Sequence, residues 1–322
     1  MTALPPELEQ NIFELVALAD FADTPRLALV ARRVWAWTEP ILYRTATIDN
    51  LNEKKGVAGA IHHHLLNNTR TSAFFHRTVK NFYIFPHHWL FMATRPSPNS
   101  WKPAELARVL HACTGVENLL VMSPEDKTLD AMSAWRPSRA AVLDFFSAGP
   151  MDVPALLARP QFQGVTHLAI AGMQDRETLD YTFDRPANRE ALVGLRGLRG
   201  LALMRDTPQT IAEQVLEMVH GLEMLLLCAA GQGEEGPSVR WADDRVVLVA
   251  DSLLDDWAAG AWGEPDMWGR AEEFVQSKRR GEVDASCFDL PPRAPQETVE
   301  TTSPESRSEY QDVACGCTAA LG

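Results

Sequence analysis

The N-terminal region has apolar positions at helical spacing. A first helix is indicated from Pro6, a residue suited to a first turn, and its apolar face is formed by Leu8, Ile12, Leu15, Val16 and Ala19. A second helix should begin after Asp23, with one apolar stripe formed by Leu27, Val30, Val34, Trp37 and Ile41. Pro40 is expected to end or kink it. Two such helices cannot bury both apolar faces alone, so the surplus must meet the rest of the chain or a partner.

From about residue 78 the pattern changes to short apolar strands separated by helical or loop segments. The recurring unit is an apolar residue, two others and then an alternating pair, as in Val116-Glu117-Asn118-Leu119-Leu120-Val121, and it indicates strands with a period of two. The central apolar residue of each unit serves as a marker, and the markers are Phe82, Leu119, Leu143, Leu168, Leu201, Leu225 and Val247. Most of their spacings fall near the roughly 20 to 29 residues of one leucine-rich repeat, which the pattern resembles.

The segments between these strands have the apolar spacing of helical crossovers. Clear examples run from Pro103 to Ala112 and from Thr207 to His220. Beyond the last strand, residues Glu264 to Arg280 are expected to form a charged helix. Strands joined by helices imply a parallel sheet, because a tight turn cannot connect two parallel strands. We expect an irregular, leucine-rich-repeat-like solenoid with a curved parallel sheet. The alternative is an ordinary α/β sandwich with unequal strands.

The expected fold class is therefore α/β, in three parts. Residues 1–48 form an all-helical head, residues 49–288 form the repeat-like body, and residues 289–322 form a tail rich in Pro, Glu, Ser and Thr. The tail has few large apolar residues and is expected to be disordered.

Charge and cysteine usage narrow the choice of partners and compartment. The chain carries 43 acidic against 30 basic residues, a formal net charge of -13, so it offers no positive field for a nucleic-acid backbone. Its five cysteines are an odd number and suit a reducing compartment. The sequence shows no signal peptide and no apolar run long enough to span a bilayer. We expect a soluble protein of the cytoplasm or nucleus that binds neither nucleic acid nor membranes.

The head resembles the F-box. The resemblance is carried by Leu4-Pro5-Pro6-Glu7-Leu8, by Ile12-Phe13-Glu14-Leu15 and by Leu27-Ala28-Leu29-Val30-Ala31-Arg32-Arg33. The continuation Trp37-Thr38-Glu39-Pro40-Ile41-Leu42-Tyr43-Arg44-Thr45 is similar to fungal F-box-like proteins, especially those of mushroom-forming fungi. The family's usual Cys and Trp in the second helix are replaced by Ala31 and Val34.

This resemblance implies a protein-binding adaptor. In the family the head docks onto the Skp-type adaptor of a cullin-RING ubiquitin ligase, and the body captures the protein substrate, whose identity the sequence does not give. By resemblance, the adaptor-binding residues would be Leu4, Pro5, Leu8, Ile12 and Val30. The alternative is a repeat-type interaction scaffold without ubiquitin-ligase association, in which the head only caps the solenoid core.

Several motifs suggest chemistry but lack the context that the chemistry requires. The stretch Gly231 to Gly236 reads G-x-G-x-x-G, yet Pro237 follows where a phosphate-binding helix should begin. The histidines and cysteines do not have the spacing of metal ligands in His62-His63-His64, in His87-His88 or in Cys315-Gly316-Cys317. The carboxylate pairs Asp243-Asp244 and Asp255-Asp256 lie in ordinary polar contexts. We therefore expect no catalytic residues, no cofactor and no metal. An enzyme with an unrecognised pocket is the third hypothesis.

Overall fold

The computed structural model describes residues 4–293 except 20, 22, 49–53, 85–100, 123–125, 145–151, 173–182, 184, 206, 229–240 and 262. The chain divides into two compact units, one up to Val116 and the other beginning at Glu117. All pairings between the described strands are parallel, and each joins consecutive strands. The expected α/β class with N-terminal helices is thereby confirmed. None of the described helices combines the length and apolar character needed to cross a membrane.

The first unit begins with helices and continues with two strands. Its elements are α1 (Pro6–Ala19), α2 (Thr24–Ala28), α3 (Arg32–Leu42), β1 (Thr45–Ile48), α4 (Gly56–Leu66), α5 (Ser72–Thr78), β2 (Asn81–Ile84) and α6 (Pro103–Ala112). Strands β1 and β2 pair with Ala46 opposite Phe82, and both residues are fully buried. At the start of the pair the Asn81 side-chain amide donates to Thr45 Oγ1 at 3.0 Å. The two buried polar side chains Thr45 and Asn81 are thus hydrogen-bonded to each other, as burial requires.

One expectation for the head was wrong. The sequence predicted a continuous helix from Thr24 to Ile41, but the chain breaks between α2 and α3, where Ala31 is extended with φ -160° and ψ 157°. Pro40 lies inside α3, which continues to Leu42. The apolar spacing runs through the break, so periodicity alone gave no sign of it. The break places Leu29 and Val30 on a turn instead of on a helical stripe.

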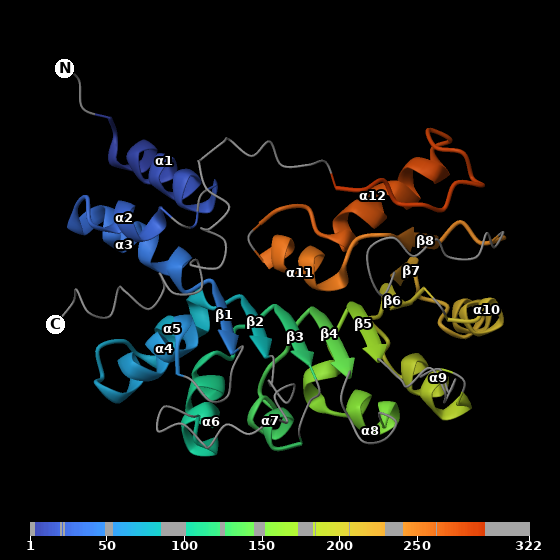
Figure 1. Ribbon diagram of the computed structural model, residues 1–322, viewed down its shortest axis with the longest axis horizontal. Helices are drawn as coiled ribbons and strands as arrows, with labels where there is room; N and C mark the ends of the chain where they lie inside the picture. Colours follow the sequence, from blue (N-terminus) through green and yellow to red (C-terminus); the bar gives the residue numbers. More distant parts are fainter. Residues whose placement is uncertain are drawn as a thin grey trace, which may run out of the picture. The chain divides into compact units, whose positions relative to one another are not determined.

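The second unit alternates strands and helices. Its strands are β3 (Asn118–Met122), β4 (Arg139–Asp144), β5 (His167–Gly172), β6 (Gly200–Met204), β7 (Met224–Cys228) and β8 (Val246–Val249). Its helices are α7 (Asp126–Ala131), α8 (Val153–Leu157), the single 3-10 turn η1 (Pro160–Phe162), α9 (Pro186–Val193), α10 (Gln209–Met218), α11 (Leu253–Ala261) and α12 (Met267–Arg279). Figure 1 shows α8, α9 and α10 on one side of these strands and α11 and α12 on the other.

The marker residues of the sequence pattern locate seven strands. All seven markers are at most 1% exposed, so the predicted strands do supply the core. The markers Leu143 and Val247 are out of register, however. The residue aligned with Leu119 is Ala140 on β4, and the residue aligned with Leu225 is Val246 on β8. Leu143 is buried on the opposite face of the sheet. A parallel sheet buried on both faces gives continuous apolar runs, which do not reveal register.

Helix α12 packs closely against the strands because small residues make room for it. The Trp268 indole contacts the ring of His167, with centroids 5.1 Å apart. A Cβ atom at Gly200, the in-register neighbour of His167, would lie 3.0 Å from the Trp268 ring and 2.6 Å from the imidazole. Gly200 is therefore required for the approach of the helix to the sheet.

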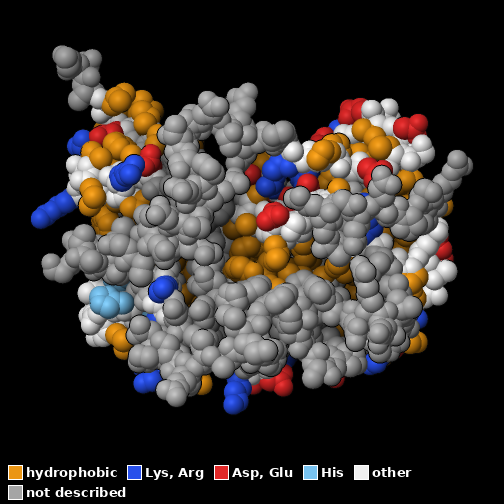
Figure 2. Space-filling view, viewed as in Figure 1, with side chains coloured by type: hydrophobic (Ala, Val, Ile, Leu, Met, Phe, Trp, Pro, Cys, Tyr) orange, Lys and Arg blue, Asp and Glu red, His pale blue; other side chains and the backbone are white. Residues whose placement is uncertain are grey.

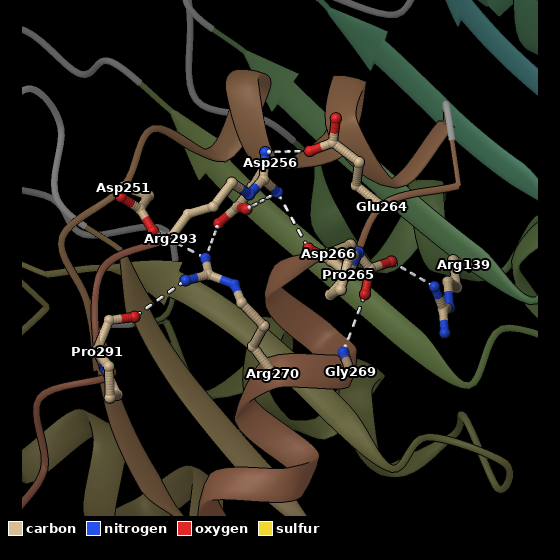
Figure 3. Close-up of polar contacts among 10 residues, drawn as sticks. All are labelled: Arg139, Asp251, Asp256, Glu264, Pro265, Asp266, Gly269, Arg270, Pro291 and Arg293. Carbon is tan, nitrogen blue, oxygen red and sulfur yellow. Dashed lines mark hydrogen bonds and ion pairs between the residues drawn. The ribbon is translucent and has the colours of Figure 1, made fainter. Parts of the chain in front are cut away.

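A cluster of charged side chains joins α11, α12 and the C-terminal segment (Figure 3). Asp256 is 1% exposed and accepts hydrogen bonds from Arg270 and Arg293, each at 2.7 Å. Burial raises the pKa of Asp256, while the two guanidinium groups oppose the shift. Arg270 also pairs with Asp251 at 2.8 Å, and Arg293 with Glu264 at 3.3 Å. A buried carboxylate with two cationic partners fixes the three segments to one another.

The body extends beyond its expected end. The sequence placed the start of the tail at Asp289, whereas Leu290 is 6% exposed and Arg293 belongs to the charged cluster. Residues 294–322, which hold the rest of the expected tail, lie outside the described residues.

Replacing the core residue Leu225 by Asp should unfold the second unit, because the new carboxylate would be buried without a partner. We expect a loss of about 3 kcal/mol or more in the free energy of unfolding. Val193 is 48% exposed, so the matched change Val193→Asp should cost little. Urea denaturation of both variants measures the difference, and equal midpoints would contradict the core assignment.

Acidification should destabilise the contact between α12 and the strands. The pKa of His167 is lowered from 6.5 to about 4, mainly by burial. The positive charges of Arg139 and Arg199 lower this pKa further, and the negative charge of Asp266 opposes them. Between pH 6.5 and about 4, His167 is therefore protonated in the unfolded chain but neutral in the folded chain. The free energy of unfolding should fall as the pH drops through this range. Denaturation curves at a series of pH values should show a shallower dependence for His167→Gln than for the unmodified protein. An unchanged dependence would contradict this role for His167.

Candidate protein-binding site

Helix α1 is held to the head by a narrow strip of contacts. Ala17 is fully buried, and its carbonyl oxygen accepts a 2.9 Å hydrogen bond from the Thr24 hydroxyl. The Phe13 ring lies 6.3 Å from that of Trp37, between ring centroids. An ion pair of 2.6 Å between Arg33 and Glu9 closes one side. These contacts use only one face of α1.

The rest of α1 presents large apolar side chains to solvent. Leu15 is 67% exposed, and the exposed fractions of Leu8, Ile12, Val16 and Leu18 lie between 39% and 50%. Leu4, which precedes the helix, is 57% exposed. Figure 2 shows hydrophobic side chains gathered over this part of the head. In an ordinary surface helix the apolar stripe faces the core and polar residues face water. Here most of the large aliphatic residues face outward.

The turn between α2 and α3 adds a second exposed apolar group. The amide groups of Leu29 and Val30 donate to the carbonyl oxygens of Arg26 and Leu27 at 3.1 and 3.0 Å. This tight turn leaves Leu29 76% and Val30 63% exposed. Helices α1 and α2 pack against each other, so both groups belong to the same three-helix head.

We call these eight residues the head surface: Leu4, Leu8, Ile12, Leu15, Val16, Leu18, Leu29 and Val30. Each is between 39% and 76% exposed. Large apolar residues that gather in exposed positions on one small helical head are a feature of interaction sites. The head surface is therefore a candidate protein-binding site.

The charges beside the head surface are locally paired. Arg26 forms an ion pair of 2.9 Å with Asp23, and Arg33 pairs with Glu9. Charged side chains thus accompany the apolar residues, as at the rim of a protein interface.

The five adaptor-binding residues expected from the F-box resemblance are all exposed. Leu4, Leu8, Ile12 and Val30 belong to the head surface, and Pro5 precedes α1 in an exposed position. Sequence reasoning missed the turn residue Leu29, the most exposed of all, because it expected a continuous helix there. Leu15, Val16 and Leu18 were also left out, since spacing identifies an apolar face but not whether that face is covered.

The three histidines of the run on α4 have different surroundings. His62 is buried with its ring against Trp101, whereas His64 Nε2 lies 2.8 Å from the Tyr43 hydroxyl. His63 lies 2.9 Å from the Asn67 side-chain amide, so the three rings have three different environments. Burial lowers the pKa of both His62 and His64. Nowhere in the described part of the chain do three His, Cys, Asp or Glu side chains gather as metal ligands would.

The other chemical motifs are ion pairs or lie outside the described residues. Asp243 pairs with Arg245 at 2.6 Å, and Asp244 with Arg279 at 3.2 Å. Asp255 is exposed, while Asp256 belongs to the charged cluster. The glycine motif at 231–236, the histidines at 87 and 88 and the cysteines at 315 and 317 fall outside the described residues.

A small cleft lies between β3, β4 and the helices α11 and α12. It is lined by Asn118, Arg139, Trp257, Asp266 and Trp268, among others. The space inside that solvent can occupy is about 20 Å³, enough for about one water molecule. Ligand pockets are typically of about 300 to 1,000 Å³. The cleft is therefore too small to enclose a metabolite, and the head surface is the stronger candidate site.

Comparison with known proteins yields no relative: no protein-family model matches this sequence, and no curated protein matches it either.

The exposure of the head surface can be measured without knowing the partner. The double change Leu15→Glu and Leu29→Glu should shorten retention on a hydrophobic-interaction column, because it places two charges in the apolar surface. The free energy of unfolding should change by no more than about 0.5 kcal/mol, since both sites are exposed. Leu66→Glu with Val193→Glu, at sites 51% and 48% exposed, is the matched control and should alter retention less. A large loss of stability in the first variant would mean that these residues are core.

Proposed function

We propose that this protein is an F-box-like adaptor. Its head surface docks onto a Skp-type adaptor, and its leucine-rich-repeat-like body binds a protein to be ubiquitinated by a cullin-RING ligase. The observation that carries the proposal is the outward-facing apolar side of α1, joined by Leu29 and Val30 at the α2–α3 turn.

The physical argument begins with the cost of exposed apolar area. Water disfavours such surface by roughly 25 cal/mol per Å², so a partner with a complementary apolar groove gains free energy by covering it. An amphipathic helix placed in a groove is a common mode of recognition, with anchors three and four residues apart. Leu8, Ile12 and Leu15 have that spacing and are each about half exposed or more. The positions singled out by resemblance are thus physically able to act as anchors.

The body supports the proposal through its regularity. Parallel strands follow one another in chain order, and helices connect the consecutive strands from β1 to β7, as in leucine-rich-repeat architectures. Such repeats bind proteins through extended surfaces rather than through enclosed pockets. A body of this kind would select its substrate by shape and by the side chains of the exposed loops and strand ends.

The alternative is an interaction scaffold without ligase association, whose head serves only as a cap. A cap buries its apolar face on the core that it protects, and the buried positions Val34 and Thr38 on α3 suit such a role. Helix α1 does not, because its large aliphatic residues face solvent. The exposure of α1 therefore favours docking, and α3 can stabilise the head in either case. Ala31 and Val34, where the family usually has Cys and Trp, remain the sequence feature that favours the alternative.

Adaptor binding gives the decisive test. Ile12→Asp and Leu8→Asp should each weaken association with a purified Skp-type adaptor by orders of magnitude, because a carboxylate would be buried in an apolar interface. Both residues are about half exposed in the free protein, so the variants should stay folded. Isothermal titration measures the affinity, and circular dichroism confirms the fold.

The control is Leu66→Asp, an exposed apolar site on α4 outside the head surface, which should bind the adaptor as the unmodified protein does. Unchanged binding by Ile12→Asp and Leu8→Asp would exclude the proposed face. If the unmodified protein binds no adaptor at tens of micromolar (~10⁻⁵ M), ligase association is rejected and the scaffold alternative stands.

A further inference from the structure

The edge of β8 carries a short paired segment, Phe288–Arg293, which we call the strap. Leu248 on β8 donates its amide to the Phe288 carbonyl oxygen at 2.8 Å, and Leu290 donates to the Leu248 carbonyl oxygen at 2.8 Å. Among the described residues these two hydrogen bonds form one parallel bridge, between Leu248 and Asp289. An edge strand presents a row of backbone groups that any suitable extended chain can pair with.

Two apolar side chains of the strap have receiving sites. The ring of Phe288 lies 4.2 Å from the ammonium group of Lys278, which is 6% exposed and bonds the Val246 carbonyl oxygen at 3.3 Å. Leu290, two residues on, is 6% exposed. Asp289 lies between them and is exposed. Alternation of this kind follows from the period of two in an extended strand.

The far end of the strap is held by charge (Figure 3). Arg293 donates to Asp256 at 2.7 Å and to the Pro265 carbonyl oxygen at 3.1 Å, and it pairs with Glu264. Pro291 and Pro292 have no amide hydrogen, so strand pairing must end at Leu290. The Pro291 carbonyl oxygen instead accepts from Arg270 at 3.1 Å.

Together these contacts describe a peptide seated on a sheet edge: an aromatic residue on a buried cation, an aliphatic residue two positions later and an arginine three positions beyond that. We propose that the β8 edge, with Lys278 at one end and Asp256 and Glu264 at the other, is a binding site for an extended protein segment of this chemistry. The strap occupies the site in cis and competes with a partner's segment, which binds by adding a strand to the sheet. This site is independent of the head surface and of the adaptor function.

The test uses full-length protein and a fluorescent peptide with the sequence of residues 286–293, carrying Cys287→Ser. The protein variant Leu290→Asp weakens the attachment of the strap but changes no residue of the β8 edge. The peptide should bind this variant saturably, and about tenfold or more tightly than it binds the unmodified protein, because the intact strap closes the site for most of the time. Fluorescence anisotropy measures both affinities. A peptide of the same length with Leu290→Asp and Arg293→Glu should bind neither protein.

Three results would overturn the proposal: no saturable binding to a folded variant, equal affinity for variant and unmodified protein, or equal binding of the control peptide. Should Leu290→Asp fail to fold, hydrogen exchange in the unmodified protein decides instead. The amides of Leu248 and Leu290 should exchange faster than that of Leu226 in β7, because local opening of the strap frees them without global unfolding. Equal protection of the three amides would show that the strap never leaves the edge.

Discussion

The second unit depends on the close packing of α12 against the strands. A parallel sheet must be covered on both faces, and α8 to α10 cover only one of them. On the other face the Trp268 ring needs the space that a side chain at Gly200 would fill. The charged cluster around Asp256 then ties α12 to α11 and to the last described residues. A single glycine and a single buried carboxylate thus set the position of the layer that closes the core.

The head differs from the second unit because the large aliphatic side chains of α1 are exposed. Among the described residues, the contacts that hold α1 include the buried Ala17, the Phe13–Trp37 pair and one ion pair, while its large aliphatic residues are exposed. Exposed aliphatic groups gain nothing in the free chain, so a stability argument does not account for them. In the function proposed above, burial in a complex would recover the free energy that folding leaves unused.

The strands were predictable from sequence because both faces of the sheet are buried and the apolar runs are continuous. The same property hid the register on β4 and β8, where Ala140 and Val246 occupy the aligned positions. Strand β1 was not identified at all, since its sequence Thr45-Ala46-Thr47-Ile48 has no apolar run. The helix break at Ala31 was missed because apolar spacing continues through it. The cluster of Asp256, Arg270 and Arg293 joins distant segments, and no local pattern could have revealed it.

An exposed apolar surface raises the question of why the free chain should not bind copies of itself. Each chain carries a formal net charge of -13, and like charges repel as two copies approach. A different protein with an apolar groove and a less acidic surface would meet a smaller barrier. The net charge of the chain therefore opposes self-association through the head surface.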